Sequence, residues 1–430
     1  MEILEHYIED LFTFLNDSPT SFHATATAGR LLAEKDFIQL DEAEPWGELS
    51  AGKYFVTRNS SSLIAFTLSA GATGCKSLRM AGAHSDSPCL KLKPEPLVQQ
   101  LGYWQLAVEV YGGALLAPWF DRDCSLAGRI IWQHPNGQLQ ETLLHCKRPL
   151  VVIPSLAIHL DPDVHKQRSI NRQIELMPIF SLIEQTDFRK FLLDELQKEH
   201  PQTPQEARIL TFDLFLYDTQ PPAVLGLKNE FICSSRLDNL LSCHALVRAL
   251  ADCTEGKDSL IVLNDHEEVG SVSTSGAQGS FLKDVLGRVF PFEKECRVLA
   301  QSLFISADNA HALHPNFIGK YEPQYAPMIN GGPVIKVNAN QRYASNAVTE
   351  ACFRMLCKEA KVPCQSFVMR NDMACGTTIG PLTAAALGVS TVDVGVPQLA
   401  MHSVRETAGS HDGWCLLKVL KTFFGAETVW

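Results

Sequence analysis

Several apolar runs of this chain end in side chains that bind metal ions or move protons. His84 and Asp86 close the run that begins at Met80, and a spacing of two residues puts both on the same side of an extended chain. A metal-bound His usually donates its other ring N–H to a carboxylate, so Asp86 is expected to orient His84 as a metal ligand. Taken alone, the pair also fits an ordinary strand-end His beside a capping Asp.

Two adjacent carboxylates, Glu267 and Glu268, follow the apolar run 260–263. Burial would raise the pKa of both groups, and close like charges repel, so a purely structural role is hard to assign. Adjacent side chains diverge, which lets one of the two Glu residues bind a metal while its neighbour acts as general base toward the metal-bound water. A solvated acidic loop is the alternative.

Three further positions supply the same kinds of donor. Asp238 precedes a helical pattern, where it would also serve as a helix N-cap, while Asp308 and His402 each follow an apolar run. Two His and three carboxylates are what two divalent ions about 3.5–4 Å apart would take if one carboxylate bridges them. The predicted metal ligands are His84, Asp238, Glu268, Asp308 and His402.

Other catalytic templates are absent from the sequence. It contains no G-x-S-x-G, no H-E-x-x-H, no phosphate-binding Walker loop and no G-x-G-x-x-G after a strand. His311 and His314 have suitable chemistry but are interpreted as supporting or structural residues. A two-metal hydrolase site is therefore the favoured reading.

The elements that must position these residues alternate between strand and helix patterns. Strands are expected near 54–57, 63–68, 78–83, 259–263, 303–306 and 391–396, and amphipathic helices over 1–16 and from Asp238. This alternation predicts an α/β domain with a central mixed, largely parallel sheet flanked by helices, whose site lies outside the carboxyl ends of the strands. The predicted catalytic domain is discontinuous, 1–91 and 233–430.

Between these two segments, residues 92–232 form a predicted β-rich insertion. Aromatic-rich strand patterns at 103–111 and 129–132 flank a hairpin turn at 135–137, and an extended run covers 209–217. A helix is expected over 180–198, broken by Pro201.

Composition limits the possible partners. The 430 residues include 37 Lys and Arg against 48 Asp and Glu, a net charge of −11, which disfavours nucleic acid and anionic membranes as partners. None of the 13 cysteines forms a C-x-x-C pair, so reduced thiols and a cytoplasmic location are expected. No apolar stretch approaches the roughly 20 residues of a membrane helix.

Seven segments in chain order resemble the signatures of aspartyl aminopeptidases. They are 83–88, 235–239, 265–270, 306–311, 340–344, 371–381 and 398–403. The resemblance implies a cytosolic exopeptidase with two zinc ions per subunit that removes N-terminal Asp or Glu from peptides. It also implies that the insertion builds a dimer and that dimers assemble into a tetrahedral dodecamer.

The resemblance further implies roles for individual residues. His84, Asp238 and Asp308 would hold one zinc ion, and Asp238, Glu268 and His402 the other. Glu267 would be the general base, Asp86 the group that orients His84, and His159 a residue that reaches into the neighbouring subunit's site.

Selectivity for an acidic first residue requires a local cation, because the protein as a whole repels anions. Lys336 and Tyr343 match positions that hold the substrate in this family, and Arg370 is the second choice of cation. Mn²⁺ and Co²⁺ remain possible substitutes for zinc. A broad or neutral aminopeptidase, an N-acyl amino acid hydrolase and a non-catalytic scaffold or cargo particle are the alternative functions.

Overall fold

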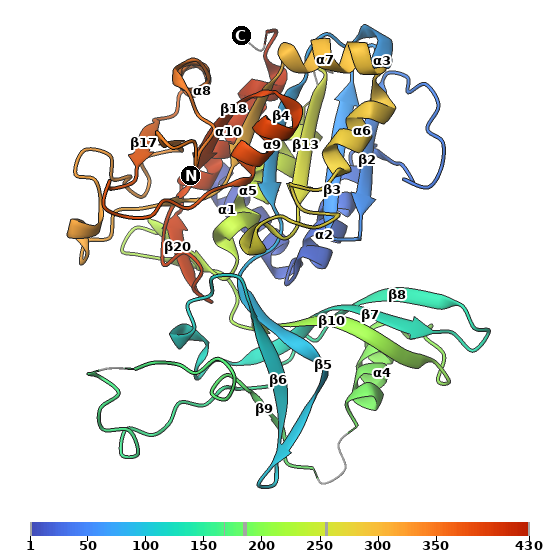
Figure 1. The fold of residues 1–430 in the computed structure, drawn as a ribbon, viewed down its shortest axis with the longest axis vertical. Coiled ribbons are helices and arrows are strands. Elements are labelled where there is room, and N and C mark those ends of the chain that lie inside the picture. The colour runs from blue at the N-terminus through green and yellow to red at the C-terminus, as the bar shows by residue number, and fades with distance from the viewer. Residues whose placement is uncertain (1, 167, 184–186, 254–256, 429–430) are drawn as a thin grey trace. The chain divides into compact units, whose positions relative to one another are not determined.

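The computed structural model describes residues 2–166, 168–183, 187–253 and 257–428, and the chain folds as two compact units (Figure 1). The first unit comprises Met1–Ser87, Pro222–Met401 and Glu406–Trp430. The second comprises Pro88–Pro221 together with His402–Arg405. Among the described helices, none has the length and apolar character that a membrane span requires.

The first unit is built on a nine-stranded sheet. In spatial order its strands are β1 (Ile38–Gln39), β2 (Gly52–Arg58), β3 (Ser62–Leu68), β13 (Ser259–Asn264), β4 (Arg79–His84), β14 (Leu303–Ala307), β18 (Ser390–Gly395), β16 (Val334–Val337) and β17 (Gln365–Val368). Strands β13, β4, β14 and β18 run parallel to one another, whereas β3 and β16 pair antiparallel with the ends of this group. The predicted α/β class with a mixed, largely parallel sheet is confirmed.

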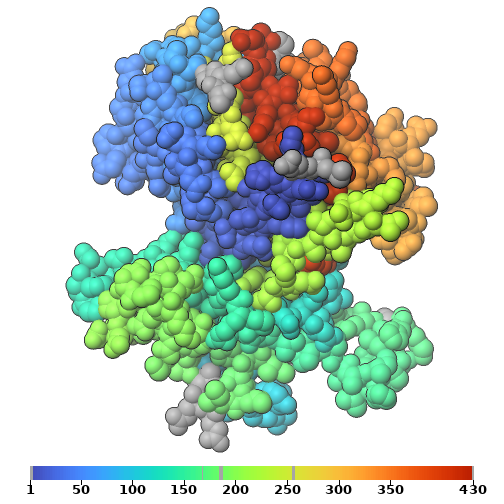
Figure 2. All heavy atoms as spheres, turned by 180° about the vertical axis from the view of Figure 1, so that it is seen from behind, coloured from blue at the N-terminus to red at the C-terminus, as the bar shows by residue number. Residues whose placement is uncertain are grey.

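Helices cover both faces of this sheet. They are α1 (Glu2–Asn16), α2 (Ser21–Ala33), α3 (Gly71–Gly74), α5 (Leu237–Ala251), α6 (Phe281–Val289), α7 (Phe292–Ala300), α8 (Ala347–Glu359), α9 (Ile379–Leu387) and α10 (Asp412–Gly425). Helices α1, α2, α5, α8 and α10 contribute to one buried apolar cluster, and α6, α7 and α9 to another. Seen from behind, α1 and α2 form part of the outer surface (Figure 2).

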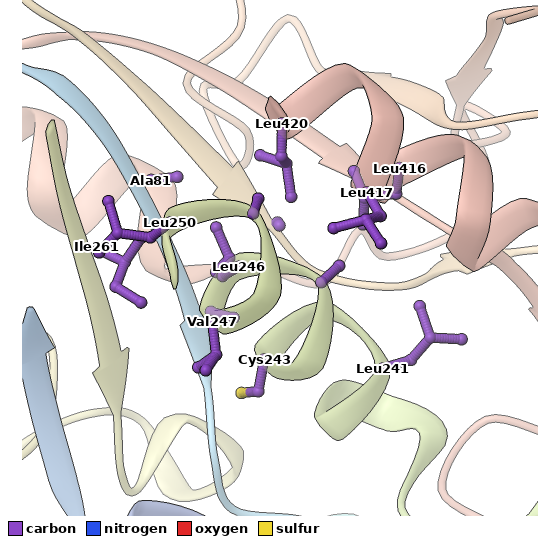
Figure 3. Packing of buried hydrophobic residues seen from close by; sticks show 14 of the residues in the cluster. Ala81, Leu241, Cys243, Leu246, Val247, Leu250, Ile261, Leu416, Leu417 and Leu420 are labelled. Atoms are coloured by element: carbon purple, nitrogen blue, oxygen red, sulfur yellow. The ribbon is translucent and has the colours of Figure 1, made fainter. Parts of the chain in front are cut away.

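Alternation along the central strands explains the two clusters. In β13, Ile261 and Leu263 belong to the cluster with α5 and α10, whereas Leu260 and Val262 belong to the cluster with α6 and α9. Successive side chains of a strand point to opposite faces, so a strand covered on both faces is apolar throughout. Figure 3 shows Leu246 and Leu250 of α5 together with Ile261 of β13 as members of this cluster.

A smaller five-stranded sheet in the same unit supports the start of α5. Its strands are, in spatial order, β11 (Ala223–Leu225), β12 (Phe231–Ser234), β20 (Glu406–Gly409), β19 (Pro397–Leu399) and β15 (Ala310–His311). Strand β12 runs directly into the turn that carries Asp238. Strand β11 belongs to this unit, although it falls inside the predicted insertion 92–232.

The second unit contains a six-stranded antiparallel sheet packed against the α-helix α4. Its elements are β8 (Leu139–His145), β7 (Cys124–Gln133), β10 (Arg208–Asp218), β5 (Cys89–Gln100), β6 (Tyr103–Tyr111), β9 (Ile179–Ser181) and α4 (Phe188–Glu199). The predicted turn at 135–137 joins β7 to β8, with Gly137 at φ 91°. One cluster of buried apolar side chains joins the sheet to α4.

The predicted helix over 180–198 is wrong at its start. Residues Ile179–Ser181 form β9 instead, and α4 begins at Phe188. The side chain of Asp187 accepts a hydrogen bond from the backbone N–H of Lys190, and this N-cap determines where the helix begins. Residues 184–186, inside the predicted helix, lie outside the described residues.

Candidate metal centre

Three central strands bring the candidate ligands to one edge of the large sheet. His84 is the last residue of β4, Glu267 and Glu268 lie in the turn after β13, and Asp308 follows β14. Because β13, β4 and β14 are adjacent and parallel, their carboxyl ends meet at the same edge. The strand order therefore brings the side chains of these turns to one edge of the sheet.

Asp238 reaches this edge from the start of α5. Its backbone N–H donates to Glu406 Oε2 at 2.9 Å, and its carbonyl oxygen accepts from Ser87 Oγ at 2.7 Å. The next residue, Asn239, donates from Nδ2 to the carbonyl oxygen of Ala307 at 2.8 Å, which ties the start of α5 to the end of β14. The peptide bond between Asp238 and Asn239 is cis.

His84, Asp238 and Glu268 form a group with the chemistry of a metal centre. One potential ligand atom from each lies within 4.8 Å of the other two. His84 Nε2 is 3.5 Å from Asp238 Oδ1 and 4.0 Å from Asp308 Oδ1, so the imidazole nitrogen faces both carboxylates. Imidazole nitrogen and carboxylate oxygen are established zinc ligands, and this donor set fits a zinc ion.

Asp86 contacts both His84 and the turn that carries Glu267 and Glu268. His84 Nδ1 lies 3.0 Å from the backbone carbonyl oxygen of Asp86 and 3.4 Å from its Oδ1. The same carboxylate accepts the backbone N–H groups of Glu267 and Glu268, each at 3.1 Å. Asp86 therefore lies beside the ring of His84, and its carboxylate also holds the turn that carries both Glu residues.

The carboxylates of this edge are electrostatically crowded. Burial raises the pKa of Glu267 to about 7, His84 opposes this rise, and Asp308 and Asp86 add to it. Burial together with Asp238 raises the pKa of Glu268 well above its usual value. Burial also raises the pKa of Asp308, against the effect of Lys336. Close buried carboxylates repel each other, so the edge favours binding of cations.

The same carboxylates stabilise a positive charge on the imidazole of His84. Burial alone would lower the pKa of its imidazole, but hydrogen bonds with Asp238 and Asp86 raise that pKa well above its usual value. A metal ion competes with a proton for the same imidazole nitrogen. Zinc binding at this group is therefore expected to weaken as the pH falls.

Lys336 and Tyr343 lie close to Asp308. Both residues are 4% exposed. Lys336 Nζ is 3.5 Å from Asp308 Oδ1 and 5.5 Å from the centre of the Tyr343 ring. A buried cation thus stands beside the candidate metal ligands, with an aromatic ring on one side.

The other predicted residues have different surroundings. Arg370 forms a bidentate pair with Asp372, with Nε at 2.9 Å and Nη2 at 2.6 Å, so its charge is already compensated. His159 is exposed in a turn of the second unit. His402 is grouped with the second unit as well, and its Nδ1 lies 3.2 Å from the carbonyl oxygen of Gly113.

One residue of the site had no predicted role. Glu406 is 1% exposed, and its carboxylate accepts the backbone N–H of Asp238. Glu406 lies in β20, four residues after His402, and the pairing of β20 with β12 brings it to the start of α5. No spacing rule in the sequence links residue 406 to residue 238, because the link depends on how these strands pair.

Comparison with known proteins identifies relatives along nearly the whole chain. Residues 14–424 match the family model described as aminopeptidase I zinc metalloprotease (M18). A protein of Azotobacter vinelandii named probable M18 family aminopeptidase 2 is 50% identical over 422 residues, which cover 97% of this chain and 98% of that protein.

Solved structures agree with these relatives. A structure of the Ape4 and Nbr1 complex contains a chain with 37% identity and a TM-score of 0.95, covering 98% of this chain and 86% of that one. The mApe1 dodecamer of S. cerevisiae is 28% identical with a TM-score of 0.83, covering 97% of this chain and 95% of that one.

Proposed function

Because the chain belongs to the M18 family of zinc aminopeptidases, we propose that it releases N-terminal Asp or Glu from peptides with two zinc ions bound per subunit. One observation carries this proposal. A His and two carboxylates lie within 4.8 Å of one another, beside a fourth acid, Glu267, whose pKa is raised to about 7. Metal ligands next to a group that titrates near neutral pH are the parts a metal-assisted hydrolysis needs.

The residues present fit the zinc that the family implies. His84, Asp238 and Asp308 would hold one ion through His84 Nε2 and two carboxylates that face it. Asp238, Glu268 and His402 would hold the second, with Asp238 shared; His402 is assigned from its sequence motif. When bound, zinc polarises the scissile carbonyl and makes water a stronger acid.

Glu267 is the proposed general base. Its carboxylate takes a proton from the attacking water and later passes it to the departing amine. Its raised pKa suits both transfers near neutral pH. Asp86 holds the backbone N–H groups of Glu267 and Glu268, so it keeps the base and a ligand in fixed relative positions.

Lys336 is the residue proposed to bind the acidic side chain of the substrate's first residue. Its ammonium group is nearly buried, and a buried cation attracts a carboxylate much more strongly than an exposed one. It lies 3.5 Å from Asp308 Oδ1, so a side chain that it binds would be near the reacting peptide bond. Tyr343, whose ring centre lies 5.5 Å from Lys336 Nζ, would contact the same substrate side chain.

Assembly is the remaining part of the proposal. The related mApe1 of S. cerevisiae is a dodecamer, and we infer the same assembly for this chain, with the insertion forming the dimer. His159, exposed in its own unit, would then reach the neighbouring site and stabilise the developing oxyanion.

A peptide panel tests the proposal. Purified enzyme is assayed on peptides that differ only in their first residue, Asp, Glu, Leu or acetyl-Asp, with zinc content measured in parallel. We expect rapid release of Asp and Glu, loss of activity with a chelator and recovery with zinc. Faster release of Leu would support a neutral aminopeptidase, and activity only on the acetylated substrate would support an acyl amino acid hydrolase.

A further inference from the structure

A single acidic residue interrupts the apolar strand β18. Asp393 is 0% exposed, and its neighbours Val392 and Val394 are fully buried as well. Burying a carboxylate is costly unless it is hydrogen-bonded or paired with a cation. Burial raises the pKa of this carboxyl group, and a hydrogen bond from Thr378 acts against that rise. Because burying the Asp393 carboxylate costs free energy, the groups that it contacts must offset this cost.

The Asp393 carboxylate joins two segments that are far apart in sequence. Its Oδ2 accepts the backbone N–H of Ala344 at 2.6 Å, and its Oδ1 accepts the hydroxyl of Thr378 at 2.6 Å. Ala344 directly follows Tyr343, and Thr378 is the N-cap of α9. The backbone N–H of Asp393 also donates to Ser345 Oγ at 2.9 Å, which fixes the same segment a second time.

Strand pairing puts Lys336 next to this carboxylate. Strands β16 and β18 are antiparallel, with Val334 opposite Gly395 and Ile335 opposite Val394. Continuing this register puts Lys336 opposite Asp393, and opposite residues have their side chains on the same face of a sheet. Lys336 also lowers the pKa of the Asp393 carboxyl, as expected for a nearby cation.

The first turn of helix α9 packs directly against the Asp393 carboxylate. A Cβ atom placed on Gly380, in the first turn of α9, would lie 2.3 Å and 2.4 Å from the two carboxylate oxygens. No side chain fits at position 380 unless this contact changes. The helix start, the Tyr343 segment and the strand of Lys336 therefore all meet at one buried acid.

We propose that Asp393 is a positioning residue for substrate selectivity, which holds Tyr343 and Lys336 in the geometry that reads an acidic first side chain. The inference rests on the proposed function, in which these two residues contact the substrate. Asp393 itself does not touch the substrate. Removing its carboxylate should weaken binding of acidic substrates and spare neutral ones, which do not use Lys336.

The test compares KM and kcat per zinc-loaded enzyme for matched peptides beginning with Asp or Leu. We expect Asp393→Ala to raise KM for the Asp peptide by about 10–100-fold, the usual cost of losing a supporting contact, and KM for the Leu peptide by less than about 3-fold. Asp393→Asn should recover most of the loss, because its amide oxygen still accepts the N–H of Ala344 and its NH₂ can donate to Thr378. Zinc content should stay at the wild-type level in both.

Asp412→Ala is the matched control. Asp412 is also 0% exposed, and its carboxylate accepts the backbone N–H groups of Asn330 at 2.6 Å and Gly332 at 2.8 Å. Its loss should lower the melting temperature without changing the ratio of KM values for the two peptides. Thr378→Val removes one of the two bonds to Asp393 and should give a smaller rise, about 3–10-fold, in the same direction, so the inference stays testable if Asp393→Ala is unstable.

The possible results separate this inference from the proposed function. An equal rise in KM for both peptides in Asp393→Ala or Thr378→Val, or the same acid-specific rise in Asp412→Ala, would overturn the positioning role while wild-type selectivity still stands. A wild-type enzyme with no preference for Asp would overturn the proposed selectivity itself, and the inference with it.

Discussion

Replacing Lys336 by Met tests how this enzyme would distinguish an acidic substrate from a neutral one. Met keeps most of the length and apolar contact of Lys but removes the ammonium group. At 4% exposure, Lys336 is held by its surroundings, so the substitution changes charge more than shape. The proposed function requires that this one charge matters for Asp and Glu and not for Leu.

The structure sets the expected size of this effect. Two unit charges about 4 Å apart attract by about 4 kcal/mol at the effective dielectric constant of about 20 that describes such sites. Desolvation of the incoming carboxylate offsets part of this, and hydrogen bonds to charged groups contribute about 1.5–3 kcal/mol net. We therefore expect kcat/KM for Asp peptides to fall by about 10–150-fold, and for Leu peptides by less than about 3-fold.

A matched control variant distinguishes the effect of the charge at Lys336 from the effect of losing one positive charge anywhere on the protein. Arg370→Met removes the same unit of charge from a partly exposed side chain that is paired with Asp372, and it should change kcat/KM by less than about 2-fold for every peptide. Zinc content must be measured in both variants, because Lys336 contacts Asp308. If Lys336→Met lowers activity equally on Asp and Leu peptides at full zinc content, Lys336 does not read charge.

Three further predictions concern the base, the assembly and stability. Glu267→Gln should keep its zinc and lose about 10²–10⁴-fold in kcat; near-normal turnover would remove Glu267 from the role of base. His159→Ala should lower kcat at unchanged zinc content and oligomeric size, and full activity would argue against a shared site. Asp10 accepts hydrogen bonds from His244 at 2.8 Å and Arg248 at 2.7 Å. Burial would raise the pKa of Asp10, but these two partners hold it well below its usual value. Asp10→Asn should therefore cost about 1.5–3 kcal/mol of unfolding free energy at pH 7. This stabilisation is fully present above the unfolded pKa of about 4 and is lost as the pH falls further, so the difference between the two proteins in chemical denaturation should narrow below about pH 4. A difference that stays constant down to pH 3 would contradict the ionic origin.

Much of the fold was predictable because the strands of this sheet are covered on both faces. Such strands are short and apolar throughout, and the expected runs at 259–263, 303–306 and 391–396 match β13, β14 and β18 within one or two residues. The start of α4 was not predictable from apolar spacing alone. It depends on the N-cap at Asp187, and β9 pairs with β6 just before it.

The candidate site was predictable only in part, for a related reason. His84, Glu268 and Asp308 stand out because each follows an apolar run, where the sequence changes abruptly from core to polar residues. Asp393 lies inside such a run. The role of a single acid there cannot be predicted from the sequence, because it depends on which groups hydrogen-bond to its carboxylate. The pairing of Arg370 with Asp372 likewise appears only once the side chains are in place.

The sequence by itself determined which chemical groups this protein carries and at which ends of its strands they lie, because strand and helix periods are local properties. Tertiary structure decided which of those groups are neighbours. The central strands follow the spatial order β13, β4, β14, β18 and β16, which is not their order along the chain. That arrangement brings His84 to Glu268 and Asp308, and Lys336 to Asp393, through long-range pairing that no local pattern encodes.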